Sequence, residues 1–401
     1  MVALLLLLSL PGGSLAKGPQ IEARSWALID ARSGDVLVSH AAKRHLPIAS
    51  TTKLMTAYVV LHELPLGRIV RAAPYAAEYG ESLLGLRPGQ RISVRDLLYG
   101  LILRSGNDAA YDLALAAAGS ESRFVAEMNR YAVALGLADT HYANPIGLDQ
   151  PGNYSSAADL VKLAEYDLTH SAYFARIVDL RGAVLHSSNG SQYVTNRNDL
   201  VGRFGWIDGV KTGHTNGAGY VLVASGHRDG MSLISAVLGT SSEPSRDANT
   251  LALLGYGFGA FRPWTPVHRG EVLARPTVKD RPGVRVSVVA AAGFTSVLAR
   301  DSRVRVDVAM RRELTGPLPA QAVVGTATVL AGRRVLARIP IVLEHRLPAV
   351  SGLSIAARFV TRPLALVVIA AVAGAGLVGL RLRIRRRRRR VDRRGRELEA
   401  A

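Results

Sequence analysis

Apolar positions follow two different periods along residues 21–262. The segment SWALIDARSGDVLVSH alternates as a β-hairpin does and predicts a turn at Ser33 and Gly34. Two apolar runs, GAGYVLVASG and MSLISAVLGT, predict adjacent core strands. Helical spacing governs the stretch after Ser50, with apolar residues at 54, 55, 58, 59 and 60. The mixture predicts an α+β or three-layer domain with helices packed on one sheet.

Two further helical regions complete this domain. The segment VRDLLYGLILRSGNDAAYDLALAAAG predicts two helices, interrupted near Ser105, Gly106 and Asn107. The segment SRDANTLALLGYGFGAF predicts a closing helix. After RPWTPV the helical period ends, and short alternating segments are separated by Gly and Pro. We therefore expect a small all-β domain at 266–348, followed by a linker at 349–363.

The hydrophobic pattern at the two ends indicates export and a membrane anchor. Residues 1–16 combine an apolar stretch with helix breakers and small residues, which is typical of a secretory signal peptide cleaved after Ala16. Residues 364–380 contain no charge and would span about 26 Å as a helix, enough for a transmembrane anchor with snorkelling flanks. The tail, 381–401, then carries 11 arginines. The positive-inside rule places this tail in the cytoplasm and everything before Arg362 outside.

Charge and composition narrow the function class. The chain has a net charge of +19, to which the tail contributes +8 from 11 arginines and three acidic residues. Beside a membrane span, such a tail is explained by orientation and by attraction to anionic lipid, so no nucleic-acid partner is expected. The remaining +11 would suit a polyanionic envelope or a lipid surface. The absence of cysteine excludes disulfides, thiol catalysis and Cys-ligated zinc.

One lysine stands out in an arginine-rich chain. Only six of the 50 basic residues are lysine, and Lys53 lies three residues after Ser50, in PIASTTKLMTA. At the start of a helix this spacing puts both side chains on one face. Lysine can lose its proton when it is buried near other cations, whereas arginine in practice cannot. The pair is therefore a candidate nucleophile and general base, although S-x-x-K alone also fits an N-cap serine beside a solvated lysine.

Two further motifs make the pattern more specific. RSGND provides Ser105 and Asn107 in the break between two helices, and GVKTGHTNGAGY provides Lys211, Thr212 and Gly213 on a predicted strand. Each motif alone also fits an ordinary turn or strand end. The glycine would leave room for a substrate backbone to lie alongside the strand.

The ordered trio resembles that of the D-alanyl-D-alanine carboxypeptidases, the low-molecular-mass penicillin-binding proteins of peptidase family S11. The resemblance extends over about residues 26–261 and includes LRPGQRISVRDLLYGLILRSGNDAAYDLA, NPIGLDQPGNYSSAADL and NRNDLVGRFGWIDGVKTGHTNGAGYVLVAS. It implies a β-lactamase/transpeptidase-like serine DD-peptidase domain, at 21–262. It also implies a membrane-anchored bacterial enzyme outside the cytoplasm, and peptidoglycan stem peptides ending in D-Ala-D-Ala as substrate.

The resemblance also implies catalytic roles. Ser50 would attack the carbonyl between the two D-alanines, with neutral Lys53 as general base. Ser105 would pass a proton to the leaving amine, and Asn107 would hold the substrate amide and Lys53. β-Lactam antibiotics would be covalent inhibitors, and no cofactor or metal is implied.

A second group of residues would bind the substrate. Lys211 and Thr212 would hold the terminal carboxylate, beside Gly213. The backbone N–H groups of Ser50 and His214 would form an oxyanion hole. Arg197, in NRNDL, would add positive charge near the carboxylate.

Three alternatives stay open at this point. A class A β-lactamase hydrolyses its acyl-enzyme with a glutamate-activated water, and HYANPIGLDQPGNYSS contains no glutamate. A transpeptidase usually carries larger additional domains. A catalytically silent peptidoglycan-binding scaffold would retain the fold without serine-dependent acylation.

Overall fold

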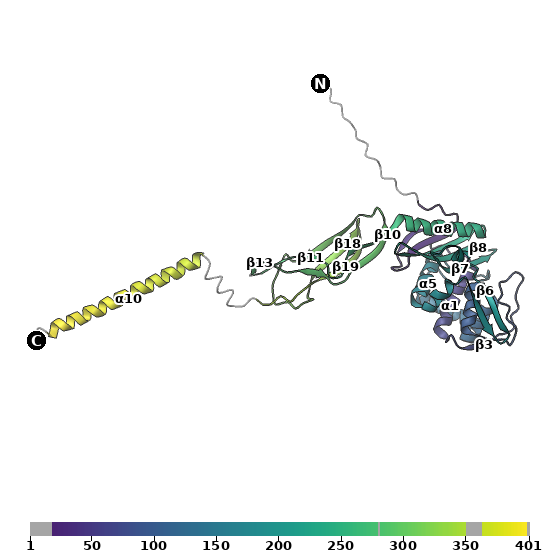
Figure 1. The fold of residues 1–401 in the computed structure, drawn as a ribbon, viewed down its shortest axis with the longest axis horizontal. Coiled ribbons are helices and arrows are strands. Elements are labelled where there is room, and N and C mark those ends of the chain that lie inside the picture. Colours follow the sequence, from purple (N-terminus) through teal and green to yellow (C-terminus); the bar gives the residue numbers. More distant parts are fainter. Residues whose placement is uncertain (1–17, 280, 350–362, 399–401) are drawn as a thin grey trace, which may run out of the picture. The chain divides into compact units, whose positions relative to one another are not determined.

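The structure is a computed structural model, which describes residues 18–279, 281–349 and 363–398. The chain divides into two compact units (Figure 1). The first comprises the chain up to Trp264 together with Ser296–Asp301, and the second comprises Thr265–Thr295 and the chain from Ser302 onward. The domain boundaries expected from the sequence stay predictions, and the predicted signal peptide, 1–16, lies outside the described residues.

A five-stranded antiparallel sheet forms the centre of the first unit. Its strand order is β2 (Val36–His40), β1 (Ser25–Asp30), β9 (Met231–Thr240), β8 (Gly219–Arg228) and β7 (Ile207–Thr215). The predicted hairpin is confirmed as β1 and β2, and the two predicted core strands pair as β8 and β9. β7 therefore lies at one edge of this sheet.

Helices cover both faces of the sheet, as the continuous apolar runs require. On one face Ala27 and Ile29 pack with the buried sides of α1 (Lys53–Glu63), α3 (Asn107–Ala118) and α5 (Ala157–His170). On the other face Leu28 packs with α8 (Glu243–Ala260) (Figure 1). Alternate residues of one strand thus serve two cores, which gives the three-layer arrangement.

The remaining elements of this unit surround the helical face. A smaller sheet has the order β3 (Ile69–Arg71), β4 (Arg91–Ser93), β5 (Gly182–Ser187) and β6 (Gly190–Thr195). The predicted interruption is confirmed at Ser105 and Gly106, between α3 and the π-helical turn η2 (Gly100–Arg104), which directly follows α2 (Val94–Tyr99). The other helices are η1 (Ala49–Thr52), α4 (Glu121–Ala134), α6 (Ala172–Val178) and α7 (Asp199–Arg203).

Short strands form the second unit around a core of its own, which includes Val288, Ile341 and Leu343. Its larger sheet has the order β11 (Val272–Ala274), β14 (Val288–Ala290), β19 (Arg334–Leu343), β18 (Val323–Ala331) and β16 (Val304–Met310). A three-stranded sheet has the order β13 (Arg281–Arg285), β12 (Thr277–Val278) and β17 (Glu313–Leu314). The paired strands β10 (Phe261–Val267) and β15 (Phe294–Ala299) carry the chain between the two units.

One long helix, α10 (Pro363–Leu398), ends the described chain (Figure 1). Within it, Leu366–Arg387 is long and apolar enough to cross a membrane. The segment overlaps the anchor expected at 364–380. Most of the predicted linker, 350–362, lies outside the described residues.

A buried carboxyl group in α5 makes the stability of the fold pH-dependent. Asp167 is 2% exposed, and its Oδ2 has no hydrogen-bond partner among the described residues. The nearby hydroxyl of Tyr142 is also buried and without a partner there. Burial raises the pKa of Asp167 well above its ordinary value. The folded state therefore keeps a proton that the unfolded chain releases above about pH 4.

We expect Asp167→Asn to stabilise the protein at neutral pH and to have little effect in acid. Because the folded pKa is raised, the wild type loses up to about 1.4 kcal/mol of unfolding free energy for each pH unit between the unfolded and folded pKa values. Asparagine has the shape of the protonated acid and does not ionise. Urea unfolding of both proteins at several pH values measures the difference. An unfolding free-energy difference that does not grow with pH would contradict this account.

Candidate active site

The turn that begins α1 holds Ser50 and Lys53 against each other. Lys53 Nζ lies 3.0 Å from Ser50 Oγ, 2.6 Å from Asn107 Oδ1 and 2.6 Å from the backbone oxygen of Ile146. Ser50 belongs to η1 and Lys53 is the first residue of α1, so one helical turn separates them, as the sequence predicts. The preceding Ala49 has a φ of 49°, a left-handed conformation typical of constrained functional turns.

Burial gives Lys53 the properties of a base. Its side chain is 0% exposed, and burial lowers its pKa to about 7. The charges of Glu81 and Asp108 oppose this lowering, and the charge of Arg197 adds to it. A neutral amine has two N–H bonds and one lone pair. Because two carbonyl oxygens can accept both N–H bonds, the lone pair is left for the proton of the Ser50 hydroxyl.

The break between η2 and α3 places Ser105 and Asn107 on the opposite side of the cleft. Ser105 has a φ of 63°, is 3% exposed, and its Oγ has no hydrogen-bond partner among the described residues. Ser105 and Ser50 line the same cavity. Gly106 allows a close approach here, since a Cβ would lie 3.1 Å from the backbone nitrogen of Leu84 and would make that backbone shift by a few tenths of an ångström. A free buried hydroxyl facing a cavity can donate to or accept from a bound molecule.

β7 forms the third wall of the cleft, with an edge that no other described strand pairs with. Lys211 is 1% exposed and donates to the oxygen of Thr212 over 3.0 Å. Burial, and then the positive charges of Lys53, Arg197 and Arg246, hold the pKa of Lys211 well below its ordinary value.

Close packing of β7 against the Ser50 turn depends on a glycine. A Cβ at Gly213 would lie 3.0 Å from both Ala49 Cβ and the backbone nitrogen of Ser50. This is tighter than nearly all real contacts of that kind, so a larger residue would push the strand away. The ring of His214 stacks on Tyr220, with centroids 4.0 Å apart.

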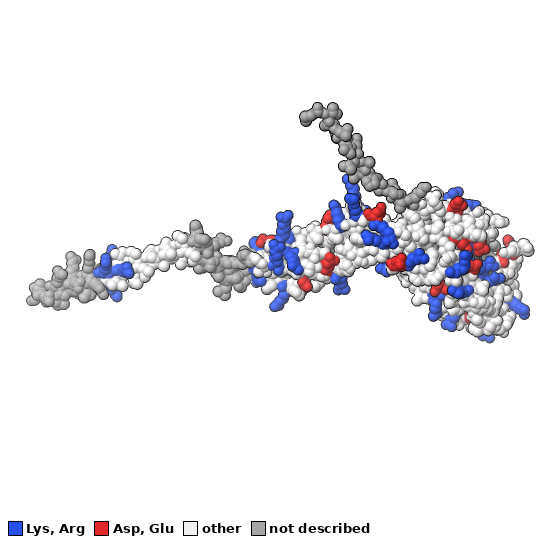
Figure 2. Space-filling view, turned by 45° about the horizontal axis from the view of Figure 1, so that its top comes forward, with Lys and Arg blue, Asp and Glu red and all other residues white. Residues whose placement is uncertain are grey.

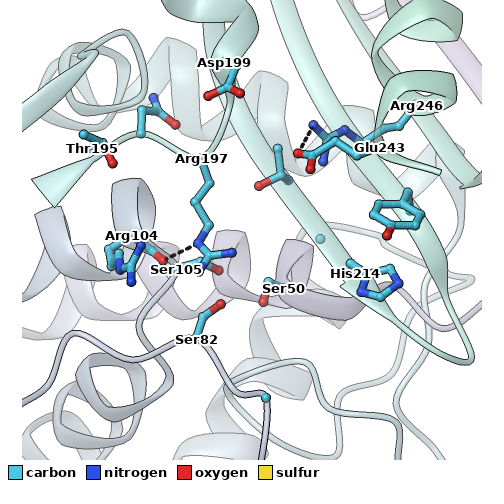
Figure 3. Close-up of a pocket in the computed structure, with 15 residues that line it drawn as sticks. Ser50, Ser82, Arg104, Ser105, Thr195, Arg197, Asp199, His214, Glu243 and Arg246 are labelled. Atoms are coloured by element: carbon cyan, nitrogen blue, oxygen red, sulfur yellow. Dashed lines mark hydrogen bonds and ion pairs between the residues drawn. The ribbon is translucent and has the colours of Figure 1, made fainter.

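The cavity on this side has a volume of about 550 Å³ and is lined by the predicted residues Ser50, Ser105, Arg197, Thr212, Gly213 and His214. Figure 3 shows Arg197 reaching into it from the same side as Ser105. Arg197 Nε donates to the backbone oxygen of Arg104 over 3.2 Å. Arg246 also lines the cavity but is paired with carboxylates of its own helix, 2.9 Å from Glu243 and 2.8 Å from Asp247. The lining contains three arginines against two acidic residues, Asp199 and Glu243, and this excess of positive charge suits an anionic ligand.

Several residues next to the site have no counterpart in the sequence prediction. Glu81 Oε2 accepts from Asn107 Nδ2 and from the hydroxyl of Tyr75, both over 2.6 Å. Although burial raises the pKa of Glu81, these hydrogen bonds and one from the backbone of Glu78 lower it overall, so Glu81 is ionised at neutral pH. It lines a second cavity that also contains Ser50 and Asn107. An isolated glutamate in YGESLLG carries no pattern that would reveal this contact.

Asp108 is the second such residue, and it fixes the loop that carries Glu81. Its carboxylate accepts the backbone N–H groups of Leu84, Gly85 and Leu86 over 2.8, 2.8 and 3.0 Å. Three charge-assisted hydrogen bonds of this kind hold a loop firmly in place. Its position directly after Asn107 in RSGND was the available signal.

Comparison with solved structures identifies the architecture. Penicillin-binding protein 5 from Haemophilus influenzae matches with a TM-score of 0.67 and 28% identity, covering 82% of this chain and 98% of that one. A point mutant of the Streptomyces K15 DD-transpeptidase matches with a TM-score of 0.57 and 33% identity, covering 60% of this chain and 99% of that one. The predicted fold class is thereby confirmed.

Sequence comparison identifies the family. The D-alanyl-D-alanine carboxypeptidase DacA of Escherichia coli K12 is 33% identical over 350 residues, which are 82% of this chain and 85% of that protein. The family model of peptidase S11, D-alanyl-D-alanine carboxypeptidase, matches residues 13–242. The chain belongs to the D-alanyl-D-alanine carboxypeptidases of peptidase family S11 and is a serine-type peptidase.

Proposed function

We propose that this protein removes the terminal D-alanine from peptidoglycan stem peptides through an acyl-enzyme on Ser50, and that penicillin inhibits it by acylating the same serine. The observation that carries the proposal is the position of Lys53 Nζ, 3.0 Å from Ser50 Oγ and beside two carbonyl oxygens that can accept its N–H bonds. This arrangement provides a nucleophile and a buried base in hydrogen-bond contact.

In the proposed reaction, Lys53 takes the proton of Ser50 as Oγ attacks the carbonyl carbon of the penultimate D-alanine. The backbone N–H groups of Ser50 and His214 stabilise the negative oxygen that forms. The C–N bond then breaks as Ser105 passes a proton to the departing amine, and the proton that Lys53 took from Ser50 replaces the one that Ser105 gave. Water hydrolyses the resulting ester, which releases the shortened peptide and restores the serine.

Substrate placement in this scheme depends on the edge of β7 and on the cations around it. An extended peptide can lie along a free strand edge, and Gly213 lets it approach Ser50 closely. The terminal carboxylate would meet Lys211, Thr212 and Arg197. Its negative charge would raise the pKa of Lys211 and so favour the ammonium form, in which attraction is strongest.

We further propose that the peptidase unit lies outside a bacterial cytoplasmic membrane. The support is the signal-like segment 1–16 and the apolar stretch within α10 that is long enough to span a bilayer. The arginines that follow would remain in the cytoplasm. This orientation places Ser50 on the side where peptidoglycan is found.

The test is to incubate the full-length protein in detergent with penicillin and to follow its intact mass. We expect a long-lived adduct of one penicillin in the wild type and none in Ser50→Ala, together with release of D-alanine from a D-Ala-D-Ala peptide. Antibiotic destroyed without a lasting adduct would indicate a β-lactamase. Antibiotic left intact would indicate a non-catalytic scaffold.

We expect Glu81→Gln to move the acidic limb of the acylation pH profile to lower pH. The charge of Glu81 raises the pKa of Lys53, together with that of Asp108 and against that of Arg197. Removing that charge lowers the pKa, so a larger fraction of Lys53 is neutral below pH 7. The oxygen of glutamine can still accept from Asn107 and Tyr75, and the hydrogen bond that is lost is the one from the backbone N–H of Glu78. Acylation rates measured across pH report the shift.

The matched control is Glu78→Gln. Glu78 lines the same cavity and carries the same charge, but its side chain does not contact Asn107. We expect its acidic limb to remain at the wild-type position. Equal shifts in both variants would mean that the overall charge of the cavity, and not the charge of Glu81 in particular, controls the pKa of Lys53.

A further inference from the structure

A group of exposed cations gathers around the small sheet β13–β12–β17 of the second unit. Five exposed side chains lie on these strands or beside them: Arg275, Lys279, Arg285, Arg311 and Arg312. We call these five residues the cationic patch. Figure 2 shows blue side chains clustered on this unit. Within 275–279, 281–285 and 311–315, Glu313 is the one acidic residue that the structure describes.

Strand pairing, not proximity in sequence, brings the five together. Thr277 pairs with Arg285 on one side and with Glu313 on the other. Lys279 donates its backbone N–H to the oxygen of Leu314 over 2.8 Å, and Thr277 donates to the oxygen of Arg312 over 3.1 Å. Residues more than 30 positions apart therefore share a surface three short strands wide.

The structure gives these cations no ion-pair partner in the described ranges, where the salt bridges of the second unit are those of His268 and Arg305. Clustered like charges repel one another and lower stability. They do not contribute to the core of the unit, since all five are exposed. An anionic surface would remove the repulsion.

The sheet that carries the patch also contacts the chain where it leaves the unit toward α10. Arg281 Nη2 donates to the backbone oxygen of Ala349 over 3.0 Å, and Leu318 bridges to Leu347. Ala349 is the last described residue before α10 begins at Pro363. The 14 chain steps between them span at most about 50 Å even when fully extended. Anchoring α10 in a bilayer would thus confine the patch to the neighbourhood of lipid headgroups.

We propose that the cationic patch docks on the phosphate groups of anionic lipids at the outer face of the membrane. The inference rests on the proposed anchor. The short tether favours lipid over a soluble envelope polymer, because it raises the local concentration of headgroups without any new contact. Each cation that reaches an anionic surface strengthens association about fivefold, within a Debye length of about 10 Å.

The absence of cysteine allows a direct test. Thr315→Cys introduces a single thiol at an exposed position next to β17, in a chain with no other cysteine. The full-length protein, labelled there with a donor dye, is reconstituted in vesicles whose headgroups carry an acceptor dye. We expect stronger energy transfer in phosphatidylcholine mixed with phosphatidylglycerol than in phosphatidylcholine alone, and we expect high salt to abolish the difference.

Two variants that each remove five positive charges show whether docking on anionic lipid depends on the cationic patch. The first changes all five patch residues to Gln, and we expect it to lower the ratio of docked to undocked protein more than about 25-fold, as two engaged cations suffice for that. The control changes five exposed cations of the first unit to Gln: Arg32, Lys43, Arg44, Arg68 and Arg71. It should behave as the wild type does. Thermal unfolding of both variants verifies that they fold.

Three results would overturn the proposal. One is equal energy transfer in both lipid mixtures from protein that still floats with the vesicles. Another is patch-dependent binding to soluble polyphosphate with no lipid dependence, which would indicate an envelope polymer as partner. Failure to float with neutral vesicles would instead show that the anchor is wrong, and the docking proposal would fall with it while Ser50 acylation by penicillin remained intact.

Discussion

Lys53→Arg is expected to slow acylation of Ser50 by penicillin by about 10³-fold or more, within the range that general bases contribute. Lys53 lies fully buried with its nitrogen 3.0 Å from Ser50 Oγ, and burial lowers its pKa to about 7. Arginine remains protonated even when buried and has no lone pair to accept the serine proton. The positive charge would be retained and the base lost.

The rate of penicillin adduct formation, followed by intact mass, measures this effect. Lys162→Arg is the matched control, because Lys162 lies on α5 and makes an exposed hydrogen bond to the oxygen of Gly136. We expect it to acylate as the wild type does. Thermal unfolding of Lys53→Arg separates a lost base from a lost fold. Near-normal acylation in a folded Lys53→Arg protein would disprove the neutral-amine mechanism.

Local patterns in the sequence were sufficient to predict most of the helices and strands around the site. Helical spacing after Ser50 identified α1, and the RSGND interruption appeared as the break before α3. The continuous apolar runs identified β8 and β9, because a strand covered by helices on both faces has no polar side. These are short-range signals, and the structure confirms them.

Contacts between residues far apart in the sequence could not be derived from the spacing of residues along the chain. Ser50 and Lys53 are related by one helical turn, whereas Asn107 reaches Lys53 only because α3 packs beside α1. Before the structure, that contact rested on resemblance to a known family. The catalytic roles themselves stay predictions until variants are measured.

Two other contacts of the site correspond to no pattern in the sequence. Lys53 donates to the oxygen of Ile146, and any residue type would provide that atom. Glu81 contacts Asn107 from a loop with no apolar period, so its sequence neighbours do not distinguish it from a solvated glutamate. Such residues become visible only when the chain is folded.

Gly147→Ala should slow acylation by about a hundredfold or more, the cost of moving a reacting group by about 1 Å. Gly147 has a φ of 94°, and a Cβ there would lie 2.0 Å from the oxygen of Ala49 and 2.9 Å from the nitrogen of Ser50. Both are backbone atoms of the turn that carries the nucleophile, so they cannot rotate away. Relief requires that the Ser50 turn or the Ile146 carbonyl move, and either movement disturbs Lys53.

Gly152→Ala separates this close approach from the cost of the backbone conformation. Gly152 lies in the same loop with a φ of 85°, but the nearest atom to its Cβ would be 3.6 Å away, in the ring of His141. We expect it to lose about 1–2 kcal/mol of unfolding free energy, the left-handed penalty of a non-glycine residue, and to acylate normally. Adduct formation and urea unfolding of both variants provide the comparison. If both slowed acylation equally, the loop conformation would control the nucleophile; if only Gly147→Ala did, the contact of this loop with the Ser50 turn would be the determinant.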